Sequence, residues 1–330
     1  MTMQNSSVFN FLKTLPFLAL LFNTTLFGDA LTQYRLYGIK NLEKQMDFDL
    51  TQQSYWYNIV KNRDTRFGYI EAYENILLCD KSKSTLSLYM KDAKENYTLT
   101  KTYNAYTGKV KGDKAREGDL RTPVGIYNIT KKLSKVDSFY GPMAFVTSYP
   151  NLYDRYLGKN GSGIWIHGLP TEQERDKFTK GCIAINNPSI ECLDRNIDIN
   201  KTVLIIQEQT KDETVSKQAL TEILSQLYEW RYAWIYNELE EYLSFYDDAF
   251  KRFNGANLES FKRYKKRVFQ KAEKKTIRFN DINVIPYPEH ENMYEITFYE
   301  FYKSNSFTFT GKKTLIIKLV NHNVKIITEQ

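Results

Sequence analysis

One histidine and one cysteine of this sequence stand in surroundings that favour nucleophilic catalysis. His167 ends the short apolar run 164–166, and Cys182 begins another at Ile183. A thiol becomes a strong nucleophile when an adjacent imidazole takes its proton. Two strand ends joined by a loop can bring these side chains together, although 15 positions (182 − 167) separate them. We therefore predict that Cys182 is a nucleophile and that His167 is its base.

Glycines flank both predicted catalytic residues. Gly168 follows the histidine and Gly181 precedes the cysteine. Glycine allows backbone conformations that a β-carbon would forbid. We expect the backbone N–H groups of Gly181 and Cys182 to point at the oxyanion that forms when the thiolate attacks a carbonyl.

Other interpretations of these residues remain open from the residue types alone. A histidine beside apolar residues is often a core or surface residue, and a single cysteine is often a small buried hydrophobe. A metal site built from His167, Cys182 and Cys192 is a third interpretation, but the closely spaced cysteine pair typical of zinc sites is missing. We expect neither a metal nor a cofactor.

The stretch 167–183 resembles the signature of the L,D-transpeptidase catalytic domain, the YkuD type. In that family, HG is followed after a loop by (S/T)-x-G-C-(I/V), and residues 179–183 here read TKGCI. Upstream, residues 118–127 read GDLRTPVGIY and resemble the family's GD-x-(R/K)-TP-x-G-x-(Y/F) segment. The resemblance covers roughly residues 76–208.

The resemblance implies a small β-rich sandwich in which Cys182 attacks a peptide and His167 is the base. The backbone carbonyl of Gly168 would orient the imidazole. We assign substrate contacts to residues around the two motifs and to the segment 141–145, which resembles the family's groove wall. These residues are Trp165, Thr179, Lys180, Gly181, Ala184 and Met143. A buried strand is an equally good interpretation of Phe145 in the wall segment.

Three positions depart from the family pattern. Thr179 stands where serine is often found, Lys180 where histidine is common, and Ala184 where the transpeptidases often carry arginine. An arginine would offer a planar fork for a substrate carboxylate, so its loss puts the acyl acceptor in question. We favour hydrolysis, which means a peptidoglycan L,D-carboxypeptidase that removes the terminal D-Ala from stem tetrapeptides. The alternatives are an L,D-transpeptidase that forms 3–3 crosslinks and a wall-binding scaffold with a degenerate catalytic domain.

The N-terminus predicts export. Residues 15–22 form an apolar core, and residues 28–30 (GDA) offer small side chains before a cleavage after Ala30. The apolar stretch is short for a membrane-spanning helix, so we expect residues 1–30 to be a signal peptide and the protein to be periplasmic. Three cysteines leave at least one unpaired. We expect all three to be free, and a Cys182–Cys192 disulfide is the alternative.

Periodicity and composition divide the rest of the chain into three parts. Residues 31–70 show helical spacing, and we expect them to pack on the next domain or to pair two copies of the chain. Residues 71–209 form the predicted catalytic domain, where Ser189 is the expected cap of a short helix. Residues 210–330 begin with a helical stripe that contains Trp230 and Trp234, and they end with four strand-like runs.

The C-terminal part resembles an NTF2-like α+β cone, so the fold class is α+β and multidomain. Cones of this kind carry a pocket under the curved sheet, for which we expect a structural or positioning role in preference to ligand binding. The basic run 262–267 is expected on a solvated helix face. The three-part layout is similar to that of the L,D-carboxypeptidases that set cell shape in helical and curved Gram-negative bacteria.

Peptidoglycan stem peptides are the expected partners. The net charge of +7 is moderate and spread along the chain. Without an arginine-rich run with interleaved aromatics, we expect no nucleic-acid binding.

Overall fold

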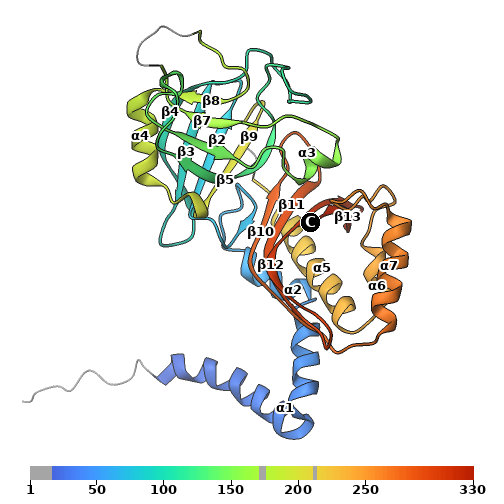
Figure 1. Cartoon of the computed structure of the whole chain (residues 1–330). Helices are drawn as coiled ribbons and strands as arrows, with labels where there is room; N and C mark the ends of the chain where they lie inside the picture. The colour runs from blue at the N-terminus through green and yellow to red at the C-terminus, as the bar shows by residue number, and fades with distance from the viewer. Residues whose placement is uncertain (1–16, 171–175, 211–213) are drawn as a thin grey trace, which may run out of the picture. The chain divides into compact units, whose positions relative to one another are not determined.

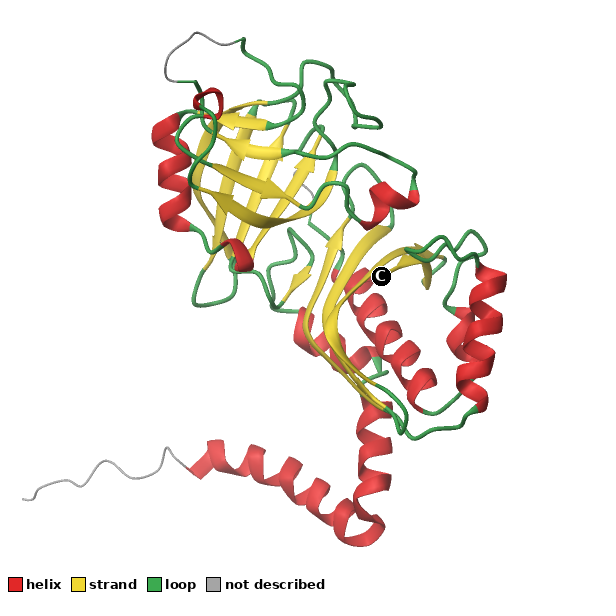
Figure 2. Ribbon diagram, in the orientation of Figure 1, coloured by secondary structure: helices red, strands yellow, loops and turns green. Residues whose placement is uncertain are grey.

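The computed structural model describes residues 17–170, 176–210 and 214–330 (Figures 1 and 2). The chain divides into two compact units, one that ends at Leu50 and one that spans Thr51–Gln330. Its mixture of helices and strands confirms the predicted multidomain α+β class.

The first unit contains helix α1 (Phe17–Asp49), which includes the beginning of the predicted helical region 31–70 and starts earlier than that region. The helix is kinked at Gly38, whose φ of 76° lies in a region that favours glycine. The predicted cleavage point after Ala30 falls within α1, whereas residues 1–16 lie outside the described part of the chain. Among the residues described, no helix combines the length and the apolar character needed to cross a membrane.

The predicted catalytic domain is a closed β-barrel with the strand order β2-β3-β4-β8-β7-β6-β5-β9. Parallel pairing of β2 with β9 and of β7 with β8 interrupts an otherwise antiparallel arrangement. The sequence predicts a β-rich sandwich, whereas the strands here close into a barrel. Closure removes the free strand edges that an open sheet would leave. The strands are β2 (Asn75–Asp80), β3 (Thr85–Lys91), β4 (Tyr97–Tyr106), β5 (Gly125–Leu133), β6 (Ala144–Thr147), β7 (Trp165–His167), β8 (Ile183–Ile185) and β9 (Thr202–Gln207). The helical segments of this domain are η1 (Ser138–Tyr140), α3 (Leu152–Tyr156), α4 (Asn187–Asn196) and η2 (Ile199–Lys201).

The barrel encloses an apolar core. Leu77, Leu88, Phe145, Ile166 and Leu204 are among its buried side chains, each at most 1% exposed. Phe145 therefore belongs to a buried strand, the second of the two interpretations of its segment.

Helix α4 begins earlier than the sequence predicts. Its N-cap is Asn186, whose side chain accepts a hydrogen bond from the Ser189 N–H at 2.8 Å. Asparagine is as good a cap as serine, and Pro188 is suited to the first helical turn. The prediction that Ser189 is the cap is therefore wrong, because a competing cap stands three residues earlier.

The C-terminal domain is a curved five-stranded sheet with helices packed along one face (Figure 1). Its antiparallel order is β1-β10-β11-β12-β13. The predicted strand-like runs form β10 (Thr276–Pro286), β11 (Met293–Lys303), β12 (Thr308–Val320) and β13 (Asn323–Glu329). The helices are α5 (Lys217–Ile235), α6 (Leu239–Ser244) and α7 (Leu258–Gln270).

Segments that precede the barrel in the sequence complete this C-terminal domain. Strand β1 (Tyr69–Ile70) pairs with β10. Helix α2 (Gln53–Val60) packs on α5, where the rings of Trp56 and Tyr228 lie 5.0 Å apart. The part of 31–70 that follows Leu50 therefore packs on the C-terminal domain and not, as one of the two alternatives had it, on the next domain in the sequence.

Lys265 is buried, although the basic run 262–267 was expected on a solvated face. Its side chain is enclosed by the rings of Trp234, Tyr242 and Phe261, with Nζ 4.4, 4.7 and 5.3 Å from the ring centroids. Burial lowers the pKa of Lys265 to about 7. Position 265 faces the core because α7 is amphipathic. The basic residues on both sides of Lys265 hide this apolar face when the sequence is inspected alone.

Replacement of Lys265 by methionine is expected to stabilise the fold by about 1–4 kcal/mol at pH 6. Between pH 7 and 10.5 the unfolded chain holds a proton that the folded chain has released, so the parent's unfolding free energy rises with pH. Below pH 7 the buried ammonium destabilises the parent by its full amount. Above pH 7 the folded protein releases this proton, so the difference in unfolding free energy between the methionine variant and the parent becomes smaller. Glu329 keeps its contacts with Lys313 and Arg252 in the variant.

Chemical denaturation of the parent and Lys265→Met at pH 6 and pH 9 measures this effect. Lys266→Met, at an exposed position of the same helix, is the control. A gain that grows with pH, or an equal gain in the control, would contradict the prediction.

Candidate active site

His167 ends strand β7, and Cys182 directly precedes the adjacent strand β8. In the parallel pair β7–β8, His167 stands opposite Ala184 and Ile166 opposite Ile183. The residues predicted as nucleophile and base are thus brought to one site across a pair of hydrogen-bonded strands.

The imidazole of His167 is oriented by the next residue. Its Nδ1 lies 2.6 Å from the carbonyl oxygen of Gly168, and the residue is 1% exposed. A carbonyl oxygen can only accept, so Nδ1 carries the proton in the neutral ring and Nε2 is the basic nitrogen. This is the arrangement that the family resemblance implies for Gly168.

An aromatic ring packs edge-on against the imidazole. The ring of Tyr140, at the end of η1, meets the His167 ring edge-on with centroids 5.0 Å apart, and it lies 5.2 Å from the ring of Trp165. Trp165 therefore lies next to the tyrosine that contacts the imidazole, and its contact with substrate stays a prediction. Sequence reasoning missed Tyr140, whose only signal was its position directly before the predicted wall segment.

The turn before Cys182 is held by the Thr179 hydroxyl. This group accepts a hydrogen bond from the Gly181 N–H at 3.0 Å and donates to the Cys182 carbonyl at 2.7 Å. The expectation that the Gly181 N–H points at an oxyanion is therefore wrong for this structure, because the threonine takes it. The Cys182 thiol donates to the Gly163 carbonyl at 3.4 Å.

The two sequence motifs are joined by a hydrogen bond. The Thr122 hydroxyl, from the upstream motif, donates to the Gly181 carbonyl at 2.9 Å and accepts from the Gly108 N–H at 2.8 Å. The buried ammonium of Lys81 in turn donates to the Thr122 carbonyl at 2.9 Å and pairs with Glu208 at 2.7 Å. The upstream motif thus supports the turn that carries the cysteine.

Replacement of Thr122 by valine is expected to lower activity about tenfold and the free energy of unfolding by about 1–3 kcal/mol. Valine keeps the shape but leaves the Gly181 carbonyl and the Gly108 N–H without their partner. Turnover of a tetrapeptide substrate and chemical denaturation measure the two effects. Thr130→Val, at an exposed position of β5, is the matched control, and equal activity of the two variants would contradict the prediction.

Ala184 and Met143 are placed differently from the prediction. Ala184 is completely buried between Tyr106 of β4 and His167 of β7, so its methyl group is not part of a surface that a substrate can contact. The Met143 side chain packs against the barrel core, and its carbonyl accepts from the Gly168 N–H at 3.4 Å. Lys180 is exposed at the turn.

The three cysteines are free thiols. Cys79 is completely buried, which raises its pKa to about 12. Cys192 lies on α4, where hydrogen bonds from the Tyr103 hydroxyl and the Lys101 ammonium lower its pKa. The alternative Cys182–Cys192 disulfide is therefore not formed.

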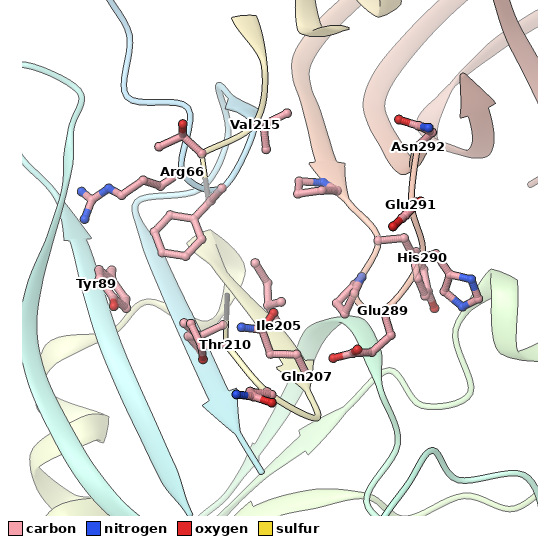
Figure 3. Close-up of a pocket in the computed structure, with 17 residues that line it drawn as sticks. Arg66, Tyr89, Ile205, Gln207, Thr210, Val215, Glu289, His290, Glu291 and Asn292 are labelled. Atoms are coloured by element: carbon pink, nitrogen blue, oxygen red, sulfur yellow. The ribbon is translucent and has the colours of Figure 1, made fainter. Parts of the chain in front are cut away.

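A cavity of about 680 Å³ lies between the barrel and the C-terminal sheet (Figure 3). Phe67, Tyr89 and Gln207 line one side, and Glu289 lines the other. None of the predicted catalytic residues lines this cavity, so we assign it no part in the chemistry.

Comparison with known proteins agrees with both resemblances. Residues 74–205 match the L,D-transpeptidase catalytic domain family (YkuD), and residues 222–330 match the Cds6 C-terminal NTF2-like domain. The crystal structure of the helical cell shape determining protein Pgp2 from Campylobacter jejuni is 37% identical with a TM-score of 0.78, and the match covers 85% of this chain and 99% of that chain. The chain belongs to the L,D-transpeptidase family. Membership supports an enzymatic, peptidoglycan-related role.

Two further relatives are more distant or match a smaller part. Bd1075 of Bdellovibrio bacteriovorus is 29% identical with a TM-score of 0.63, over 81% of this chain and 96% of that chain. The L,D-transpeptidase-type protein YafK of Escherichia coli K12 is 36% identical over 113 residues, which are 34% of this chain and 42% of the relative. The chain thus spans less than half the length of this curated relative.

Proposed function

We propose that this protein is a periplasmic L,D-carboxypeptidase that removes the terminal D-Ala from peptidoglycan stem tetrapeptides. The observation that carries the proposal is the arrangement of His167. Its Nδ1 is held by the Gly168 carbonyl at 2.6 Å, and Cys182 directly precedes β8, the strand that pairs with β7 at His167. Nucleophilic cysteine chemistry requires an imidazole whose orientation is fixed near the thiol.

The reaction proceeds in two steps. The Nε2 of His167 takes the thiol proton, and the sulfur of Cys182 attacks the carbonyl between meso-diaminopimelate and the terminal D-Ala. The C–N bond breaks, the imidazolium returns its proton to the leaving amine, and D-Ala departs. Water then attacks the thioester with His167 again as base, which releases the tripeptide and restores the thiol.

The alanine at position 184 supports hydrolysis, with water as the acyl acceptor, over transfer to a second stem peptide. The buried alanine offers no cationic fork for the carboxylate of a second stem peptide. Transfer to the side-chain amine of a second stem, which forms a 3–3 crosslink, is the alternative reaction of the same thioester. A wall-binding scaffold is the alternative without chemistry, and the ordered His167–Gly168 contact favours the enzyme over it.

A role in cell shape follows from the similarity to Pgp2, which is described as helical cell shape determining and is matched over 99% of its chain. Expression of Cys182→Ala in a strain that lacks this protein tests whether shape depends on the chemistry. Recovery of shape by the variant would support the scaffold.

The proposal also includes export of the protein and the formation of a homodimer. Residues 1–30 direct the chain to the periplasm, and α1 joins two copies. Support for pairing comes from the apolar side chains that α1 exposes, among them Leu31 (63%), Tyr34 (52%), Leu36 (53%) and Ile39 (57%). Light scattering of residues 31–330 and 51–330 tests it, and a monomer in both samples would remove it.

Mass spectrometry of purified disaccharide-tetrapeptide incubated with residues 31–330 tests the reaction, with Cys182→Ala as control. Loss of one D-Ala that disappears in the variant is the expected result. Crosslinked dimers would identify a transpeptidase, and no turnover in either sample would favour the scaffold.

A further inference from the structure

Asn187, the first residue of α4, contacts the two segments that hold the imidazole of His167. Its Oδ1 accepts a hydrogen bond from the Leu169 N–H at 2.7 Å. A β-carbon added to Gly168 or Gly141 would lie 2.4 or 2.5 Å from the same oxygen. The amide oxygen is therefore packed directly against both glycines.

The hydrogen bond to Leu169 acts on the group that orients the imidazole. The Leu169 N–H and the Gly168 C=O belong to one peptide unit, which is planar and rigid. Anchoring the N–H at Asn187 therefore fixes the direction of the carbonyl on its opposite side, and that carbonyl holds His167 Nδ1 at 2.6 Å. A donated N–H also polarises the peptide and makes its carbonyl a better acceptor.

The contact with Gly141 acts on the other neighbour of the imidazole. Gly141 directly follows Tyr140, whose ring lies edge-on to His167 with centroids 5.0 Å apart. Gly141 has a φ of 71°, a conformation that favours glycine and that brings the chain against Asn187. One amide oxygen thus borders both segments that touch the ring.

The position of Asn187 is itself tied to that of the cysteine. Asn187 follows directly from β8 through Asn186, whose side chain caps α4. Cys182 precedes the same strand. The Asn187 side chain therefore links β8, which follows the nucleophile Cys182, to the backbone groups that orient the base His167.

We infer that Asn187 is a positioning residue that sets the imidazole of His167 relative to the Cys182 thiol. The inference rests on the proposed function insofar as that function makes His167 the base. Asn187 does not touch the reacting atoms; it acts through the Gly168–Leu169 peptide and through Tyr140.

The test compares Asn187→Ala with Asn187→Asp. Aspartate keeps an acceptor oxygen at the same place, whereas alanine removes it. Both changes are made in a Cys192→Ser background, because hydrogen bonds lower the pKa of the Cys192 thiol and this thiol would react with the probe. The readouts are the rate of iodoacetamide alkylation at Cys182 between pH 5 and pH 9, and kcat and KM for D-Ala release.

Alanine is expected to lower kcat about 10- to 100-fold, the range found when groups that orient a catalytic residue are removed. KM should stay within about twofold, and alkylation should move to higher pH. Aspartate should remain within about threefold of the parent in kcat, because its oxygen restores the contact. Asn196→Ala, at the other end of α4, controls for loss of an asparagine from this helix and should match the parent.

Parent-like kcat and an unchanged alkylation profile in Asn187→Ala would overturn the inference. Equal losses in the alanine and aspartate variants would do so too, because a contact through the acceptor oxygen requires rescue. The outcome is distinct from that of the proposed function. If D-Ala release requires Cys182 but not Asn187, the function stands and the inference fails. If the parent releases no D-Ala, yet alanine alone shifts the alkylation profile, the inference stands without the function.

Discussion

Replacement of His167 by glutamine is expected to lower the rate of D-Ala release by at least about 10³-fold. Glutamine fills a similar space but provides no basic nitrogen for the thiol proton. The imidazole is 1% exposed and held by Gly168, so water cannot take over its position without rearrangement. Single-turnover release of D-Ala and alkylation of Cys182 across pH measure the loss, and alkylation should require a more alkaline solution than in the parent.

His290→Gln provides the matched control for this histidine. The ring of His290 packs on Tyr153 at 5.3 Å, in the contact between α3 and the C-terminal domain, and takes no part in the proposed chemistry. We expect its turnover to equal that of the parent. Activity of His167→Gln within tenfold of the parent would show that another group takes the proton.

Replacement of Gly181 by alanine is expected to lower activity by about 10²-fold through displacement of the nucleophile. Gly181 has a φ of 135°, where residues with a β-carbon are strained, and the added carbon would lie 2.8 Å from the Arg121 carbonyl oxygen. Backbone atoms cannot move aside as a flexible side chain does. The turn must therefore shift, and the Cys182 sulfur shifts with it.

Gly158→Ala separates strain from displacement. Gly158 has a similarly unfavourable φ of 72°, but its added carbon would meet no atom within 4 Å. Both variants should lose about 1–3 kcal/mol of stability, measured by denaturant unfolding, and only Gly181→Ala should lose turnover. Retained turnover in Gly181→Ala would mean that the turn tolerates a side chain.

The local pattern of the sequence was sufficient to predict most of the secondary structure and to name candidate residues for the site. Alternating and helical spacings predicted the strands of both domains and α1, because each records which face of an element is buried. The two motifs identified the family. The motifs with their flanking glycines singled out His167, which is the last residue of β7, and Cys182, which directly precedes β8.

Local patterns were misleading where two nearby residues could take the same role, and where the decisive partner is distant in the sequence. Asn186 and Ser189 are both good caps, and only the path of the chain after β8 selects the first. Lys265 lies within a run of charges but faces the rings of Trp234 and Tyr242, which come from other helices. For Lys265 the decisive partners lie outside the window from which the pattern was read.

By itself, the sequence determined the identity of the nucleophile and base candidates, the family and the order of the elements, because these depend on residue types and short spacings. Only the tertiary structure decided how the site is supported. The Gly181 N–H is taken by Thr179, the Gly181 carbonyl by Thr122, and the Gly168–Leu169 peptide is anchored by Asn187. The bonds from Thr122 and Asn187 join segments that are far apart along the chain. Short-range periodicity carries no record of such contacts, and they form only when the barrel closes.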